Sequence, residues 1–271
     1  GGVVNIITRK VADKWSGSAA ADATVQLHRD FGNLYNGNGY LQGPLVSGLL
    51  GVAVRGNASG RAASLLNYEN AGGDQVEVSQ RGPSPVANRI WGLGGRLSLT
   101  PHPDHDLYVD LNLDRQWYDN SKGQLGTLGI RGYAEAQRFN QQEYVLAHNW
   151  RLPFGEWQST LSRASRETIG RILPSDVPGG GKAGDPRMLE ATNSIFDSKL
   201  SASLANHIFT VGGQYWWAEM VDGVAPAPYR HRQWAGFAED EWRIADNFAL
   251  TGGVRYDHHS IFGGHVSPRG Y

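Results

Sequence analysis

Residues 234–259 read WAGFAEDEWRIADNFALTGGVRYDHH, two long alternating segments on either side of a short turn at residues 245–247. Strands of globular proteins average about 5 to 6 residues, whereas a strand that crosses a bilayer at a tilt needs about 9 to 11. Each arm of this hairpin has room for the longer strand. One such hairpin would also fit the edge of a soluble β-sandwich, so the fold depends on whether the rest of the chain repeats the pattern.

Turn-forming residues divide the whole chain into strands that are joined alternately by short and long connections. Gly, Pro, Asn, Asp and Ser favour turns, each for its own backbone reason. Short turns are predicted at residues 46–48, 101–105, 153–156, 205–207 and 245–247, and long polar segments at residues 60–88, 120–132, 171–190 and 222–230. Short turns at one rim and long loops at the other are typical of outer-membrane barrels.

The segment that begins at His105 has the two-residue period of a strand with one apolar and one polar face. Its apolar members are Leu107, Val109, Leu111, Leu113 and Trp117, and the residues between them are polar or aromatic with a polar tip. Residues 91–100 and 196–204 alternate in the same way. One face suits lipid and the other suits water, although a soluble sandwich also alternates.

Two positions break this alternation. Arg115 lies on the apolar face after Leu113, and Phe237 shares the face of Glu239 and Glu241. A β-bulge, or a position beyond the bilayer, would account for either residue.

The strand count and the charged polar faces favour a wide barrel. About eleven strands fit between Ser16 and Ile261, and a twelfth begins near His265. Small barrels fill their interior with side chains, whereas barrels of about 16 to 22 strands leave a channel or hold a plug. Bacterial barrels close with even strand numbers. The sequence therefore predicts an all-β, antiparallel transmembrane β-barrel whose sheet is incomplete.

Composition and motifs argue against several other classes of protein. The 271 residues include 36 Gly, 9 Trp, 11 Tyr and no Cys, and the formal net charge is -1. Disulfides and the basic surface of a nucleic-acid-binding protein are therefore not expected. The longest uncharged stretch, residues 39–54, is too rich in glycine and polar residues for a membrane helix. Catalytic motifs are missing, and the glycines before Lys182 lack the Ser or Thr of a phosphate loop, so no enzymatic activity is expected.

Several segments resemble one family of membrane proteins. The opening GGVVNIITRK, Gly1 to Lys10, is similar to the end of the plug domain of TonB-dependent outer-membrane receptors. Residues 97–120, 237–256 and 258–269 resemble the barrel of the ferric catecholate siderophore receptors of that family, the enterobactin and colicin I receptor type. The resemblance implies that residues 1–12 end the plug and that residues 13–271 form about the first half of a barrel of about 22 strands.

The same resemblance implies a location and a function. The expected location is the outer membrane of a Gram-negative bacterium, and the expected function is uptake of a ferric siderophore, of catecholate type, energised by TonB–ExbB–ExbD through the plug. Lipopolysaccharide and other outer-membrane lipids, and colicins or phages at the loops, are further implied partners. No intrinsic cofactor is expected because the iron arrives already chelated. A general diffusion porin or a surface adhesin remains the alternative, against which the plug-like opening argues.

Candidate ligand-binding residues follow from the chemistry of such a ligand. A ferric catecholate is anionic and aromatic, so its receptor needs cationic groups and stacking surfaces. The candidates on or beside the predicted outer loops are Arg81, Arg131, Tyr133, Arg166 and Arg171, with Arg89 and Lys182 on the same side. Arg131 and Tyr133 rank first because a cation and an aromatic ring leave a short loop together. Each candidate can instead be a solvated loop charge or a contact to lipopolysaccharide.

Nine histidines raise the alternative of a metal held by the protein itself. His258 and His259 are adjacent on a strand, so they point to opposite faces and cannot easily share an ion. His102 and His105 flank a tight turn together with Asp104 and Asp106. A polar turn explains that cluster without a metal, and no protein metal site is predicted.

Overall fold

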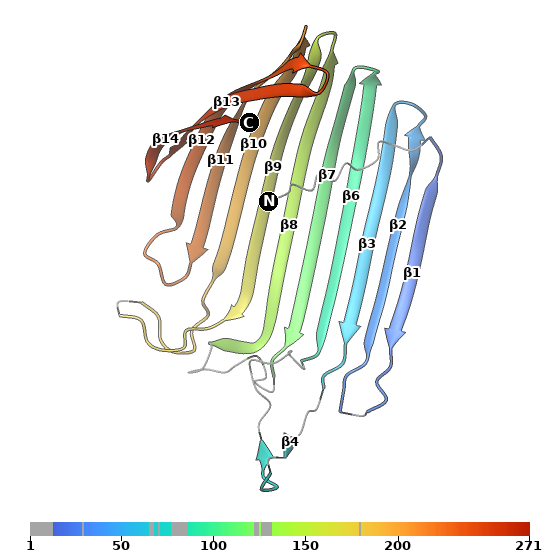
Figure 1. Ribbon diagram of the computed structural model, residues 1–271. Helices are drawn as coiled ribbons and strands as arrows, with labels where there is room; N and C mark the ends of the chain where they lie inside the picture. The colour runs from blue at the N-terminus through green and yellow to red at the C-terminus, as the bar shows by residue number, and fades with distance from the viewer. Residues whose placement is uncertain are drawn as a thin grey trace.

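The computed structural model describes residues 13–28, 30–64, 68–69, 71–76, 86–121, 125, 132–178 and 180–271. Within these residues one antiparallel sheet contains twelve strands in the order of the chain (Figure 1). They are β1 (Ser16–Thr24), β2 (Leu34–Val46), β3 (Leu50–Arg61), β6 (Asn88–His102), β7 (His105–Asp119), β8 (Tyr133–Leu152), β9 (Gly155–Arg171), β10 (Leu189–Leu204), β11 (His207–Asp222), β12 (Tyr229–Ala245), β13 (Phe248–His259) and β14 (Gly263–Gly270). A separate small hairpin pairs β4 (Tyr68–Glu69) with β5 (Gln75–Val76). The prediction of an all-β antiparallel sheet of about twelve strands is confirmed.

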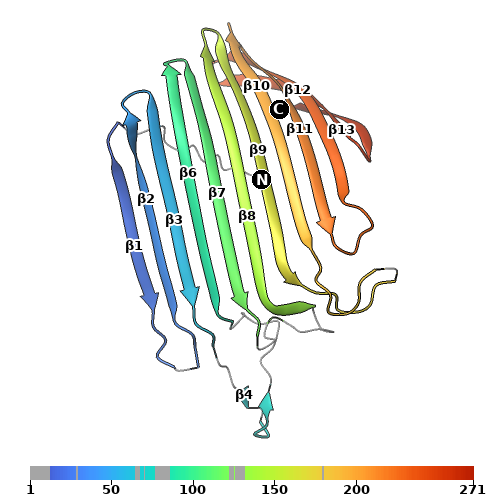
Figure 2. The same cartoon turned by 180° about the vertical axis from the view of Figure 1, so that it is seen from behind.

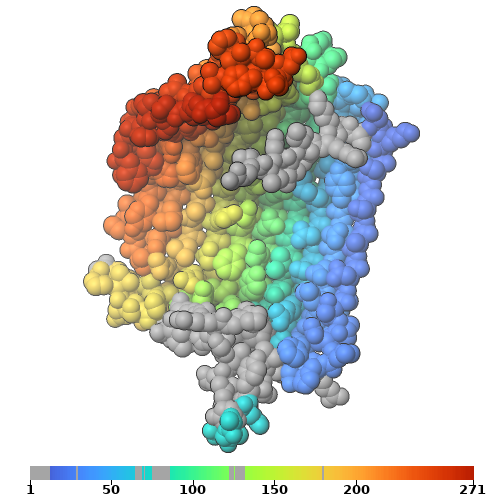
Figure 3. Space-filling view, viewed as in Figure 1, coloured from blue at the N-terminus to red at the C-terminus, as the bar shows by residue number. Residues whose placement is uncertain are grey.

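The large sheet curls into an open trough, with β1 and β14 at the two ends of the strand order (Figure 1). The view from behind shows the convex side (Figure 2). Strand twist accumulates across neighbouring strands and produces this curl. At one end of the trough the last strands, β13 and β14, arch over the concave side (Figure 3). No helix long and apolar enough to span a bilayer occurs in the part of the chain described.

Short and long connections alternate between the two rims, as the turn pattern predicts. The short turns lie at residues 47–49, 103–104, 153–154, 205–206 and 246–247. The long connections leave from the opposite rim, at the lower end of the strands in Figure 1, where β4 also lies. Their described parts are residues 62–64, 68–69, 71–76, 86–87, 120–121, 125, 132, 172–178, 180–188 and 223–228. The strands are long enough to leave the bilayer, since β8 has 20 residues where about 9 to 11 suffice. The long-loop rim therefore stands clear of the membrane.

Each face of the sheet carries one kind of side chain. Register pairs link one outward row across seven strands: Leu97, Val109, Leu146, Leu161, Phe196, Tyr215 and Trp234. These side chains are exposed on the convex side, which is where lipid contacts a barrel. The concave side carries polar and charged groups, among them Arg55, Arg96 and Asp110. The predicted division into a lipid face and a water face is confirmed.

The two irregular positions have separate explanations, and neither is a bulge. The β6–β7 and β7–β8 registers run without a shift through Arg115, which lies on the outward face near the long-loop rim. Phe237 is on the concave side in unbroken register with Gly212 and Arg255. Its ring occupies the space above Gly212, where an added Cβ would come within 2.5 Å of it. Glycine on the neighbouring strand thus accommodates an aromatic ring on a charged face.

Candidate functional site

Cationic groups and aromatic rings, which an aromatic, anionic ligand needs, gather near the long loops of the sheet. We call this region the inner rim and define it by Tyr133, Arg166, Arg171, Trp216, His231 and His259. These residues belong to five strands that are neighbours in the sheet, β8, β9, β11, β12 and β13, with β10 between them. The sheet curls across these strands (Figure 1).

Tyr133 and Arg171 form the first part of the inner rim. They are register partners at the ends of β8 and β9, and the Arg171 guanidinium carbon lies 4.4 Å from the centre of the Tyr133 ring. Such an arrangement is a cation–π interaction. It holds a guanidinium in place without neutralising its charge, so the group can still attract an anion.

A bulge in the β8–β9 pair brings these two residues together. The register shifts between Tyr133 and Arg138, and the side chain of Gln137 fills the space with 0% exposure. The Gln137 Nε2 group donates to the carbonyls of Ala134, Ala136 and Gly170, the last at 2.6 Å. A buried amide that satisfies several carbonyls stabilises irregular backbone. The position of the Tyr133 ring therefore depends on Gln137.

Gly170 makes the opposite side of this bulge. Its φ is 96°, in the region that favours glycine. An added Cβ would also come within 2.0 Å of the Ala136 carbonyl oxygen. Both the conformation and the close approach require glycine at this position.

Arg166 lies on the concave face of β9, five residues before Arg171, which follows the irregular backbone at Gly170. Its register partners are Gln141 and Ala191, and its side chain is exposed. No hydrogen bond or ion pair involves it among the described residues. Arg166 thus offers a free positive charge to the space in front of the wall.

A chain of four rings forms the second part of the inner rim. Trp216 and His231 meet edge to face with centroids 4.8 Å apart. His231 and His259 are stacked at 4.9 Å, and His259 and Phe262 follow at 4.8 Å. The first three rings are half-buried, whereas Phe262, in the turn after β13, is 84% exposed. The chain ends in a ring that an aromatic ligand can reach.

Hydrogen bonds fix the orientation of two of these rings. Trp216 donates from Nε1 to the Asn193 side chain at 3.0 Å. The Nδ1 atom of His259 accepts from the backbone N–H of Ile261 at 3.1 Å. That role requires an unprotonated Nδ1, which places the ring proton of neutral His259 on Nε2. The turn between β13 and β14 therefore depends on an unprotonated nitrogen of His259.

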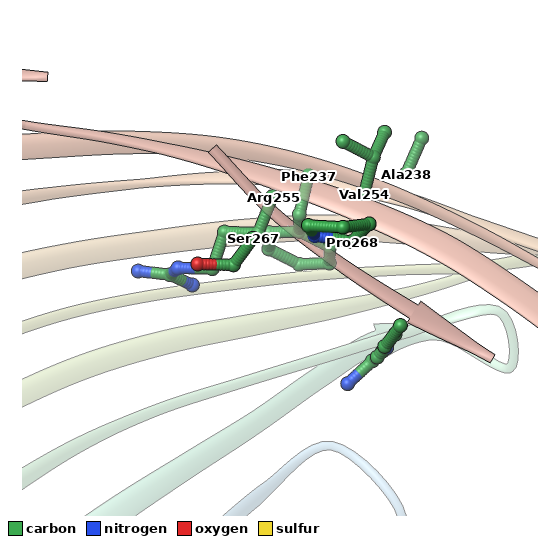
Figure 4. Close-up of a pocket in the computed structure, with 7 residues that line it drawn as sticks. Phe237, Ala238, Val254, Arg255, Ser267 and Pro268 are labelled. Carbon is green, nitrogen blue, oxygen red and sulfur yellow. The ribbon is translucent and has the colours of Figure 1, made fainter. Parts of the chain in front are cut away.

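Below the rings the wall is a polar network around Arg255. Arg255 binds the Asp257 carboxylate at 2.8 Å and donates to Gln214 at 3.2 Å, and Gln214 donates to Asp197 at 2.7 Å. Figure 4 shows the Arg255 side chain directed away from Val254, which lies on the opposite face. A cavity of about 390 Å³ opens beside it under the arch of β13 and β14. The network keeps the lower wall polar and its charges paired.

An ion pair attaches the β9–β10 connection to the rim. The Arg187 guanidinium binds the Asp222 carboxylate through two hydrogen bonds of 2.8 and 2.5 Å. The hydrogen bond to Asp222 raises the pKa of Arg187, against an opposing effect of burial. Asp222 ends β11, so this pair holds the end of the connection, at Arg187, close to the inner rim.

The predicted site residues are only partly brought together. Tyr133 and Arg171 are in contact, while Arg166 is on the same wall without touching either of them. Arg81 and Arg131 lie outside the described residues, as do residues 1–12, so the predicted plug boundary stays a prediction. In the described ranges no group of three or more His, Cys, Asp or Glu side chains could hold a metal.

Sequence reasoning missed the chain of rings. His259 was correctly separated from His258, which faces outward and stacks on Trp234 at 5.7 Å. The contact to His231 follows from the pairing of Gln233 with His259, since His231 then lies diagonally across on the same face. The two-residue period combined with the register of β12 and β13 would have found it.

Comparison with known proteins relates nearly the whole chain to one family. A family model described as TonB dependent receptor-like, beta-barrel matches residues 15–271. The iron-regulated outer membrane virulence protein of Vibrio cholerae is 28% identical over 279 residues, which cover 100% of this chain and 38% of that protein. The ferrienterobactin receptor of Escherichia coli K12 is 24% identical over 313 residues, 99% of this chain and 41% of that protein. The chain thus spans about two-fifths of the length of these curated relatives.

A solved structure has the same arrangement of strands. The crystal structure of a ferric enterobactin receptor mutant from Pseudomonas aeruginosa superposes with a TM-score of 0.72 at 21% sequence identity. The match covers 100% of this chain and 43% of that one. At this level of identity the similarity concerns the fold.

Proposed function

Because the chain belongs to the TonB-dependent receptor β-barrel family, we propose that its protein takes up a ferric siderophore of the catecholate class with energy from TonB. The barrel lies in the outer membrane of a Gram-negative bacterium, as do its relatives. The name of the Escherichia coli relative, a ferrienterobactin receptor, supports a siderophore as the ligand. The iron is cargo that arrives inside its chelator, so the protein needs no metal ligands of its own.

The observation that carries the choice of ligand is the combination of rings and guanidinium groups on the inner rim. A ferric catecholate has a negative charge and flat aromatic rings. Arg171 and Arg166 supply positive charge, and the ring chain that ends at Phe262 supplies a stacking surface. Charge-assisted contacts and ring stacking on one wall suit such a ligand.

Coupling to TonB–ExbB–ExbD is part of the same proposal. It rests on family membership, because the described residues are the barrel wall and the coupling would act through a plug. The family match also disfavours the porin and adhesin alternatives. A diffusion pore has no need of a ring chain at its mouth.

Growth under iron limitation tests the proposed function. A strain that lacks its own catecholate receptors would carry the full-length gene and receive one ferric siderophore at a time. We expect growth on a ferric catecholate, and loss of that growth when tonB is also deleted. Growth on a ferric hydroxamate but not on a catecholate would contradict the ligand class, and growth without tonB would contradict the coupling.

A further inference from the structure

The turn between β13 and β14 ends the chain of rings with a side chain that burial cannot hold in place. Phe262 is 84% exposed, so little of its apolar surface is removed from water to fix its position. Its ring is stacked on that of His259, with the centroids 4.8 Å apart. The orientation of Phe262 therefore depends on the backbone of the turn.

The backbone of this turn is a three-residue loop. His259 and Gly263 are register partners, and Gly263 has a φ of 78°, as in hairpin loops of this length that close with a left-handed residue. The start of the loop is fixed to β12. Ser260 donates its backbone N–H to the Arg232 carbonyl at 2.8 Å, and its hydroxyl accepts from the Arg232 N–H at 3.0 Å. The two backbone N–H groups that follow Ser260 need another acceptor.

The Nδ1 atom of His259 supplies that acceptor. Ile261 donates its backbone N–H to this nitrogen at 3.1 Å, and Phe262 donates at 3.4 Å. Neither N–H group has another acceptor in the part of the chain that the structure describes. One side-chain nitrogen thus closes the turn on the residue that carries the exposed ring. It can do so only while it is unprotonated, since a protonated imidazole has donors at both nitrogens.

Other titratable groups face the same region from β12, β13 and β14. His231 of β12 is stacked on His259 with the centroids 4.9 Å apart. On the same face of β13, Asp257 is bound by Arg255 at 2.8 Å, and His265 of β14 is the register partner of Asp257. The carboxylate is therefore already paired with a guanidinium. His231 and His265 are also titratable, so each must be removed separately before an effect of pH is assigned to His259.

We propose that His259 is a positioning residue for ligand binding, whose unprotonated Nδ1 holds the Phe262 ring at the end of the ring chain and whose protonation releases that ring. This role rests on the catecholate function proposed above, because a stacking surface serves an aromatic ligand. Histidine is the side chain whose charge ordinarily changes between about pH 5 and 8. Protonation replaces the acceptor with a donor that faces two N–H groups. In acid the rim therefore loses its outermost stacking surface.

Fluorine NMR of the full-length protein in detergent micelles, with para-fluorophenylalanine at position 262, reports on the turn without any ligand. We expect the fraction of released ring to be at least about fivefold larger at about pH 5 than at about pH 8, because two hydrogen bonds are lost. His259→Asn retains a side-chain oxygen as acceptor and cannot be protonated, so its spectrum should not depend on pH. A wild-type spectrum that ignores pH, or an equal response in His259→Asn, would overturn the proposal.

Two control variants remove the other histidines that face this region. His231→Phe keeps an aromatic ring beside His259, and His265→Asn removes the imidazole opposite Asp257. Both variants should keep the wild-type response of the fluorine label to pH. Loss of that response in either control would assign the proton to the histidine that was removed, and the role given to His259 would then be wrong.

Binding of a ferric tricatecholate at about pH 8 tests the consequence for the ligand. His259→Phe keeps a ring beside His231 but has no acceptor, so it should bind about twofold to tenfold more weakly than the wild type. His259→Asn should bind more tightly than His259→Phe, and equal affinities of His259→Phe and the wild type would contradict the positioning role. If the wild type binds no ferric tricatecholate, the proposed function fails, while the fluorine titration still decides whether His259 holds the turn.

Discussion

The Arg171 guanidinium carbon lies 4.4 Å from the centre of the Tyr133 ring, across a bulge that joins the loop ends of β8 and β9. This contact places a positive charge and an aromatic ring side by side at the long-loop end of the sheet. It also unites two residues that are 38 positions apart in the chain, from Tyr133 to Arg171.

Loss of the Tyr133 ring should weaken ligand binding more than loss of its hydroxyl. Cation–π contacts contribute about 0.5 to 2 kcal/mol, so Tyr133→Leu should lower the affinity for a ferric catecholate about twofold to thirtyfold. Tyr133→Phe keeps the ring and should bind as the wild type does. Isothermal titration of the purified full-length protein measures both. Equal losses in the two variants would remove the ring from the explanation.

Gly170→Ala should disturb the bulge that positions Tyr133. The residue combines a φ of 96° with a Cβ position 2.0 Å from a carbonyl oxygen, and such backbone strain costs roughly 1 to 3 kcal/mol. We expect faster hydrogen exchange at residues 132–138 and weaker ligand binding. Gly236→Ala is the control, because a Cβ there would meet nothing within 4 Å. Unchanged exchange in Gly170→Ala would contradict the role given to this glycine.

The ring chain predicts a difference between two histidines on neighbouring strands. His231 is stacked on His259 on the concave side, whereas His258 is stacked on Trp234 on the convex side. His231→Ala should lower uptake of an iron-labelled catecholate, and His258→Ala should leave it unchanged. A similar loss in both variants would indicate a general effect on folding, and no loss in either would separate the ring chain from the ligand.

The carboxylate of Asp110 should be important for barrel stability. It is 3% exposed and is bound by Arg55 at 2.5 Å and by Arg96 at 2.7 Å. Asp110→Asn would leave two guanidiniums facing each other, at a cost of about 2 kcal/mol because both reach solvent in part. Asp114→Asn, on the same face of β7, removes no ion pair that the structure shows within its described ranges. Thermal unfolding in detergent compares the two variants. Equal melting temperatures would contradict the stabilising role of the Asp110 carboxylate.

Breaking the Arg187–Asp222 pair should release the β9–β10 connection from the rim. Both side chains are partly exposed, and pairs of this kind contribute about 1 kcal/mol or less. Arg187→Gln should therefore speed proteolysis within residues 172–188 by up to about fivefold. Arg243→Gln breaks an ion pair with Glu241 at the opposite rim and should not alter that cleavage. A cleavage rate that is the same in Arg187→Gln and the wild type would show that the pair does not hold the loop.

The strands, their faces and the alternation of turns could be predicted from the sequence because each depends on residues that are close in the chain. Leu107 and its alternate neighbours define an outward face by period alone, and Ala245 to Asn247 define a turn by composition. Phe237 could not be placed in this way. Its position depends on Gly212, which lies opposite on the preceding strand, and the two-residue period carries no information about a neighbouring strand.

The candidate site was harder to predict from the sequence, because it too depends on how neighbouring strands pair. Tyr133, Arg166 and Arg171 could be chosen by residue type and nearness to loops, but their arrangement depends on the shift in register near Gln137. The buried position of Gln137 could not be predicted, since a glutamine in a polar strand segment resembles any other glutamine. The ring chain needed both the period of β12 and its pairing with β13. The sequence pattern does not reveal the register between strands. Long-range contacts determine that register.

Equilibrium binding of a ferric tricatecholate to the purified full-length protein tests the central claim most directly. Quenching of tryptophan fluorescence gives the dissociation constant for the wild type and for the double variant Arg166→Gln and Arg171→Gln. We predict saturable binding that is at least tenfold weaker in the variant, and no saturable binding of a ferric trihydroxamate. Equal affinities in the two proteins, or equal binding of the two chelates, would contradict the assignment of the inner rim to a catecholate ligand.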